Sequence, residues 1–135
     1  MTGRAPSGLL DTSVLIAEES GRRLQVEALP DNAFVSVVTI AELQAGVLAA
    51  RDTAVRAIRL ATLDAVSVLQ PLTIDATAAL HWAVLRVRLA EEGRHAKIND
   101  LWIAAVALAN HLPVVTQDED FDSIEAVGGP LVIRV

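Results

Sequence analysis

Two hydrophobic patterns alternate along the chain. Short apolar, β-branched runs predict buried strands, whereas stretches with an apolar residue at every third or fourth position predict helices. We expect strands ending at Leu10 and covering 33–38, 114–116 and 131–135, and a short strand within 66–74 that Pro71 confines to a sheet edge. We expect helices beginning after Thr12 or Ser13 and covering 24–29, 39–50, 53–63, 75–92 and 98–111, with one helical turn in 122–127. This alternation predicts a three-layer α/β/α domain with a mainly parallel central sheet.

The stretch 8–16 interrupts its own apolar pattern once. An apolar run ends at Leu10, one acid and two hydroxyls follow, and the apolar residues then resume. Because Thr12 or Ser13 can cap a helix, Asp11 falls at the end of a strand, where open α/β sheets place their ligand crevices. A carboxylate between apolar neighbours is costly to bury without a partner. Asp11 is therefore the first candidate site residue; capping of the following helix is the structural alternative.

Four further acids stand at other joints between the predicted elements. Glu42 lies in the first helical turn after the second strand, and Asp100 opens the most apolar helix. Asp118 and Asp120 follow the third strand. Since the carboxyl ends of parallel strands meet at one edge of a sheet, these acids and Asp11 are expected to share one crevice.

Each of these acids also has a purely structural interpretation. Thr39 and Glu42 have the spacing of a capping box, in which Glu42 would reach back to the backbone of Thr39. Asp100 would complement a helix dipole, and 118–120 would form a solvated turn. The repetition of one chemistry at four separate joints favours the shared site.

Composition and charge change this picture in two ways. The 135 residues suffice for one domain, 1–135, of which 1–7 are expected to form a poorly ordered N-terminal extension. The chain has no cysteine, no apolar run of the ~18 residues that a membrane span needs, and no hydrophobic leader at its N-terminus, which is typical of a cytoplasmic protein. With 53% hydrophobic residues and a mean hydropathy of +0.44, we expect a buried interface, in a homodimer or with another partner.

The net charge of −6 by itself argues against a nucleic-acid partner. However, setting aside the five candidate site acids leaves 12 acids against 11 bases, which is close to neutral. Clustered carboxylates repel one another and would bind a hard cation through oxygen, so Mg²⁺ or Mn²⁺ is the expected occupant. Such a site can bind a phosphodiester and activate a water molecule.

Four ordered motifs carry a resemblance to a known family. They are Asp11-Thr-Ser, Ser36-x-x-Thr39-x-x-Glu42-Leu43, Asn99-Asp100-x-x-Ile103-Ala104-Ala105 and Thr116-x-Asp118-x-Asp120-Phe121. From about residue 9 onward, the chain resembles the PIN-domain ribonucleases, and most closely the VapC-type toxins of bacterial toxin–antitoxin pairs. The resemblance implies a PIN-like fold and a dimeric Mg²⁺- or Mn²⁺-dependent endoribonuclease that leaves 5′-phosphate and 3′-hydroxyl ends and is silenced by a cognate antitoxin.

The same resemblance implies roles for individual residues. Asp11, Glu42, Asp100 and Asp118 would be catalytic and hold the metal, with Asp120 as a support or a ligand of a second ion. Ser13 and Thr116 would be hydroxyls that orient carboxylates or water. Arg94 and Lys97, on the 93–97 loop that leads to Asp100, are the preferred RNA contacts; the bases at 51, 56 and 59 and a plain solvated surface remain the alternatives.

Two other functional classes stay open at this point. Receiver-like and haloacid-dehalogenase-like domains also place an Asp after an early strand. The dehalogenase-like pattern needs a second acid where Ser13 stands, and the receiver-like pattern needs a late lysine, whereas the only lysine, Lys97, precedes Asp100. The other class is a non-catalytic PIN-like binding module whose acids hold a structural ion or an arginine-rich partner.

Overall fold

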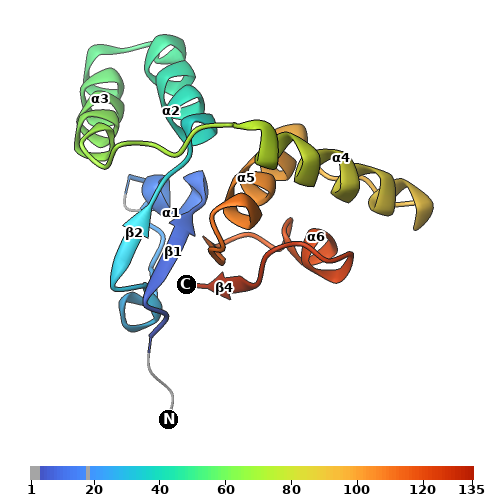
Figure 1. Ribbon diagram of the computed structural model, residues 1–135. Coiled ribbons are helices and arrows are strands. Elements are labelled where there is room, and N and C mark those ends of the chain that lie inside the picture. The colour runs from blue at the N-terminus through green and yellow to red at the C-terminus, as the bar shows by residue number, and fades with distance from the viewer. Residues whose placement is uncertain (1–3, 18) are drawn as a thin grey trace.

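The computed structural model describes residues 4–17 and 19–135. Its centre is a sheet of four parallel strands, three of which are labelled in Figure 1, and their order is β2-β1-β3-β4. The strands are β1 (Ser7–Leu10), β2 (Asn32–Phe34), β3 (Val114–Thr116) and β4 (Val132–Arg134). The prediction of a parallel sheet within an α/β domain is therefore confirmed. The N-terminal extension was predicted to include residue 7, but Ser7 pairs with Asn32 in β1; residues 1–3 of that extension lie outside the described residues.

Helices cover both faces of this sheet because its central strands are buried on both sides. In the register Leu9 lies opposite Val114, and Leu10 lies opposite Val115. The helices are α1 (Thr12–Ala17), α2 (Val37–Ala49), α3 (Thr53–Ser67), α4 (Ala76–Glu91), α5 (Ile98–Ala109) and α6 (Asp122–Ala126), with a short 3₁₀ turn, η1 (Val26–Ala28). Leu9 and Val114 pack into the core cluster beneath α4, α5 and α6, whereas Leu10 and Val115 pack into the cluster beneath α1, α2 and α3. The predicted three layers are confirmed.

Two boundaries differ from the sequence prediction for local reasons. The strand predicted at 33–38 ends at Phe34, because the Ser36 hydroxyl caps α2 by accepting from the backbone N–H of Thr39. The strand predicted within 66–74 is wrong. Instead α3 continues to Ser67, and the segment after it contributes a single parallel bridge between Ser36 and Leu72.

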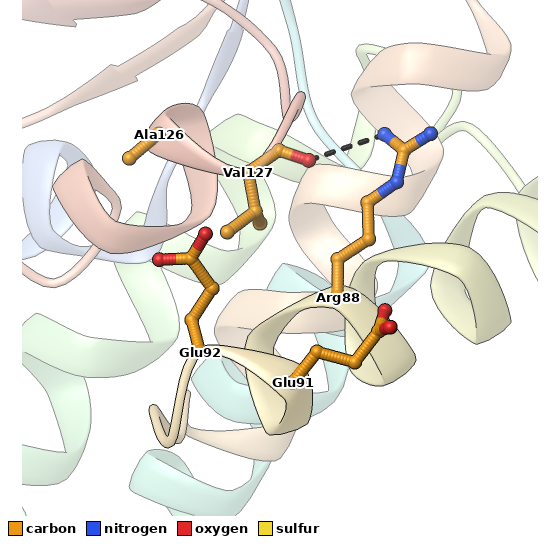
Figure 2. Close-up of a pocket in the computed structure, with 5 residues that line it drawn as sticks. All are labelled: Arg88, Glu91, Glu92, Ala126 and Val127. Atoms are coloured by element: carbon orange, nitrogen blue, oxygen red, sulfur yellow. Dashed lines mark hydrogen bonds between the residues drawn. The ribbon is translucent and has the colours of Figure 1, made fainter.

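A hydrogen bond joins the last helical turn before β4 to α4. The Arg88 guanidinium donates to the Val127 carbonyl oxygen at 3.2 Å (Figure 2). The next residue, Gly128, has φ +97, and a Cβ there would lie 2.6 Å from Nη1 of Arg88. Glycine therefore serves both the backbone conformation and the close approach. Glu91 and Glu92 border the same cavity, of about 630 Å³, whose lining includes none of the five candidate acids.

No helix within 4–17 and 19–135 combines the length and the apolar character needed to cross a membrane.

Candidate active site

The candidate acids lie near the point between β1 and β3 where the order of the strands in the sheet reverses. From β1 the chain passes to β2 on one side, and later returns to β3 on the other side. The carboxyl ends of β1 and β3 therefore flank the topological switch point, the place at which open α/β sheets bind ligands. Asp11 follows β1 directly, and its backbone N–H donates to the Val115 carbonyl oxygen at 2.8 Å. The sequence prediction for Asp11 depended on this topology.

The carboxylate of Asp11 is buried among hydroxyls, and its residue is 3% exposed. Its Oδ2 accepts from Ser13 Oγ at 2.6 Å and from Thr116 Oγ1 at 2.9 Å. Burial raises the pKa of Asp11, the two hydroxyl hydrogen bonds lower it in part, and the nearby charge of Asp118 raises it again. Asp11 is thus held in one orientation at an electrostatic cost that a bound cation would relieve.

Ser13 and Thr116 connect this carboxylate to the loop after β3. Each hydroxyl donates its proton to Asp11 and accepts a backbone N–H from the loop: Gln117 N lies 3.1 Å from Ser13 Oγ, and Asp118 N lies 3.0 Å from Thr116 Oγ1. Both side chains are buried. The two hydroxyls therefore fix the backbone that carries Asp118 relative to Asp11, which is consistent with the orienting role expected for them.

The side chain of Glu42 is positioned by a hydrogen bond from a residue of α1, and not by its own helix α2. The Thr12 hydroxyl donates to Oε1 of Glu42 at 2.7 Å, and it also lies 3.0 Å from the Thr39 hydroxyl. The capping-box alternative is wrong, because Ser36 is the N-cap of α2 and Glu42 lies beyond its first turn. Glu42 lines two surface cavities of about 340 and 360 Å³, so its carboxylate is accessible. The sequence predicts only a helix-capping role for Thr12, although its place between Asp11 and Ser13 was a signal for a role in the site.

Asp100 lies in the first turn of α5. Its Oδ2 is buried and has no hydrogen-bond partner among the described residues. Burial, followed by the charges of Asp11, Asp120 and Glu42, raises the pKa of Asp100 to about 7. The influence of Lys97 opposes this shift. Asp100 therefore lies within electrostatic reach of acids from three other elements.

Asp120 and Lys97 form an ion pair at the rim of this group. Lys97 Nζ lies 2.9 Å from Oδ2 of Asp120, with side chains 75% and 40% exposed. Its hydrogen bond to Asp120, and the charges of Asp120, Asp100 and Asp118, raise the pKa of Lys97. Lys97 thus faces the acids, whereas Arg94 lines a separate cavity beside α4. The two residues predicted together as substrate contacts lie in different surroundings.

The five acids fit a hard cation in chemistry, although they do not form a closed coordination shell. Their donors are all carboxylate oxygens, and Oδ2 of Asp100 is a buried acceptor that lacks a donor. Across 4–17 and 19–135, no three acidic or histidine side chains meet closely enough to hold a metal ion as they stand. A cation would therefore have to draw the carboxylates together against their repulsion.

Comparison with known proteins identifies the family of this chain. The family description "PIN domain" matches residues 8–127. The chain belongs to the PIN domain family. It is 52% identical over 135 residues to Ribonuclease VapC5 of Mycobacterium tuberculosis, a match that covers 100% of both chains. It is also 38% identical over 119 residues to Ribonuclease VapC4 of the same organism, covering 88% of this chain and 92% of that relative. The resemblance to VapC-type PIN domains is confirmed.

Solved structures agree with this assignment. The PIN domain matches a crystal structure of VapBC-5, a member of the VapBC family of toxin-antitoxin systems from Mycobacterium tuberculosis, with a TM-score of 0.89 and 50% identity over 96% of this chain and 99% of that one. DNA-bound VapBC from Salmonella typhimurium matches with a TM-score of 0.76 and 24% identity over 96% and 98% of the two chains, which supports the fold alone. The receiver-like and dehalogenase-like alternatives are thereby excluded.

Proposed function

We propose that this PIN domain is a divalent-cation-dependent endoribonuclease that acts as the toxin of a toxin–antitoxin pair in the cytoplasm. One observation carries the proposal: in a chain 52% identical to a relative named Ribonuclease VapC5, acids from four parts of the fold lie within electrostatic reach of one another at the carboxyl edge of β1 and β3. The substrate would be RNA, cut by hydrolysis of a phosphodiester to leave 5′-phosphate and 3′-hydroxyl ends.

Asp11, Glu42, Asp100 and Asp118 would hold Mg²⁺ or Mn²⁺, with Asp120 in support. When bound, the cation supplies Lewis-acid stabilisation of the phosphate and a water molecule of lowered pKa. The chain's own residues would provide the geometry. Ser13 and Thr116 orient Asp11 through its Oδ2. Thr12 orients Glu42, and Lys97 places one positive charge beside the acids, where an RNA phosphate would approach.

Two partners accompany this proposal. The VapBC-5 neighbour is described as a toxin-antitoxin system, so a cognate antitoxin that covers the acids is the expected inhibitor. The chain also exposes large apolar side chains on α4, including Leu80 at 64% and Val84 at 37%, which supports an association of two copies as a homodimer. Sedimentation of the purified chain and its co-purification with a co-expressed antitoxin would test these two partners separately.

The decisive experiment is cleavage of total bacterial RNA by the purified chain with Mg²⁺, Mn²⁺ or EDTA. We expect discrete fragments with 5′-phosphate ends that require metal and that are absent with Asp11→Asn. Asp31→Asn is the matched control, because Asp31 lies on the surface at the opposite, amino edge of the sheet, beside Arg4. Cleavage that survives in Asp11→Asn would contradict the site. Silence of the wild type with every metal, despite Mn²⁺ binding, would favour the non-catalytic binding module.

A further inference from the structure

A basic cavity with an aromatic wall lies beside the acids and takes no part in the proposed chemistry. It has a volume of about 310 Å³, within the size range of small-ligand pockets, and lies between α4 and the segment that leads into α5. Its functional side chains are Trp82 and Arg86 from α4 and Arg94 and His95 from the connecting segment. Leu101, the neighbour of Asp100 in α5, also lines it, so the cavity borders the helical turn that carries one of the five acids.

Flat groups are stacked along this wall. The rings of Trp82 and Trp102 stack with centroids 4.9 Å apart and planes 18° apart. Cζ of Arg86 lies over the Trp82 ring, 5.6 Å from its centroid. The indole N–H of Trp82 is buried and has no acceptor among the described residues. The wall therefore offers the flat, cationic guanidinium of Arg86 for stacking, and Trp82 under it carries a buried indole N–H without an acceptor among the described residues.

The charge of the cavity is opposite to that of the whole chain. Its lining contains Arg86 and Arg94 and no acidic side chain, whereas the chain has a net charge of −6. A ligand that combines a planar ring with a negative charge suits this lining. Unpaired bases of single-stranded RNA stack on aromatic rings and on arginine guanidinium planes, while their phosphates bind cations.

We propose that this cavity is a nucleobase subsite, in which one base of the RNA strand next to the cleaved phosphate stacks on Arg86 above the Trp82–Trp102 pair. Arg94 binds the phosphate of that nucleotide. The inference rests on the proposed function for the identity of the strand, but binding of a single nucleotide does not require cleavage. The subsite contributes to substrate choice, because a base that stacks well in the cavity sets which phosphodiester reaches the acids.

The protein carries its own probe for this site. It has two tryptophans and no tyrosine, so its intrinsic fluorescence comes from the Trp82–Trp102 stack. The full-length chain would be titrated in EDTA with each of the four ribonucleoside monophosphates, and with ribose 5-phosphate as the ligand that lacks a base. We expect saturable quenching, and a shift of the Trp82 indole N–H resonance in ¹H–¹⁵N spectra, with at least one nucleotide and not with ribose 5-phosphate.

Matched variants assign the effect to the cavity. Arg86→Ala is expected to weaken nucleotide binding about tenfold, as expected for loss of one base-stacking surface. Arg94→Ala, which removes the cation that binds the phosphate, provides a second variant should Arg86→Ala not fold. Arg4→Ala removes an exposed arginine at the amino edge of the sheet and should bind as the wild type does. Equal binding by Arg86→Ala, Arg94→Ala and Arg4→Ala would overturn the subsite, as would quenching by ribose 5-phosphate alone or quenching that depends only on protein concentration.

RNA cleavage separates this inference from the proposed function. With the subsite, Arg86→Ala raises KM for RNA more than it lowers kcat and changes the preferred cleavage positions. If the wild type cleaves RNA and Arg86→Ala keeps its KM and cleavage positions, the subsite is wrong and the ribonuclease stands. If nucleotides bind in the cavity but no RNA is cut with any metal, the subsite stands as a nucleotide site and the ribonuclease proposal fails.

Discussion

The hydroxyl of Thr12 lies 2.7 Å from Oε1 of Glu42, and this contact joins the first turn of α1 to the middle of α2. The two residues are 30 positions apart in sequence. Thr12 is also the direct neighbour of Asp11. One hydroxyl therefore sets the distance between two acids that come from different elements.

Replacing Thr12 should impair the site without unfolding the protein. In Thr12→Val the Glu42 carboxylate loses its hydrogen bond and gains rotational freedom, so we expect Mn²⁺ affinity and kcat to fall by about 10- to 100-fold. Thr12→Ser keeps the hydroxyl and should restore most of both. Isothermal titration with Mn²⁺ and RNA cleavage rates measure the two effects. A Thr12→Val variant as active as the wild type would show that Glu42 needs no such support.

Asp100 should make the metal-free protein less stable as the pH rises. Its pKa is about 7 in the folded protein against an ordinary value of 3.8, so between these values the folded state holds a proton that the unfolded chain has released. Below the ordinary pKa of 3.8, Asp100 is protonated in both states and does not lower the free energy of unfolding. Between the two pKa values it lowers that free energy progressively as the pH rises, and above about pH 7 the full penalty is present.

Asp100→Asn removes this penalty. At about pH 8 in EDTA, we expect its free energy of unfolding to exceed that of the wild type by on the order of 2 kcal/mol, with the difference vanishing near about pH 4. Urea denaturation at both pH values measures it. Saturating Mn²⁺ should stabilise the wild type at the higher pH and do so less for Asp100→Asn. A variant less stable than the wild type at both pH values would contradict the cause assigned to the raised pKa.

Ser13→Ala should cost more stability than an ordinary serine replacement. The substitution leaves the Gln117 N–H without its acceptor and removes a donor from the buried Asp11, so we expect a loss of about 1–3 kcal/mol. Ser20→Ala is the matched control, because its hydroxyl donates to a backbone carbonyl at an exposed position and its loss should cost under about 1 kcal/mol. Thermal denaturation of the two variants side by side gives the comparison, and equal losses would refute the linking role of Ser13.

Lys97→Met should move two affinities in opposite directions. Removal of the positive charge frees Asp120 and strengthens the negative field at the acids, so Mn²⁺ should bind several-fold more tightly. RNA should bind more weakly, with a raised KM, because one cation that faces the phosphate is lost. Stability should change by under about 1 kcal/mol, since the pair is exposed. If both affinities fell together, Lys97 would have a structural role.

The topology accounts for which sequence predictions held. Parallel strands could be predicted because short apolar runs alternated with helical repeats, and the crevice followed because all strand ends share one edge. The short strand predicted within 66–74 was wrong because Val66 is buried in the last turn of α3, while Val68 and Leu69 beyond it are exposed. Tertiary packing therefore decided the length of α3. The sequence does not predict Ser36 as the N-cap of α2, because the apolar residues on both sides of it predict a continuous strand.

The sequence by itself determined the chemistry of the candidate site: five candidate acids at joints between elements, and the hydroxyls of Ser13 and Thr116 close to two of them in sequence. These assignments need only residue type and the position of each joint, both of which are local properties. Only the tertiary structure decided which side chains meet. These contacts are the hydrogen bond from Thr12 to Glu42, the ion pair of Lys97 with Asp120, and the stacking of Trp82 on Trp102. Such contacts join elements that are distant along the chain, and side-chain orientation across that distance is set by packing of the helices on the sheet.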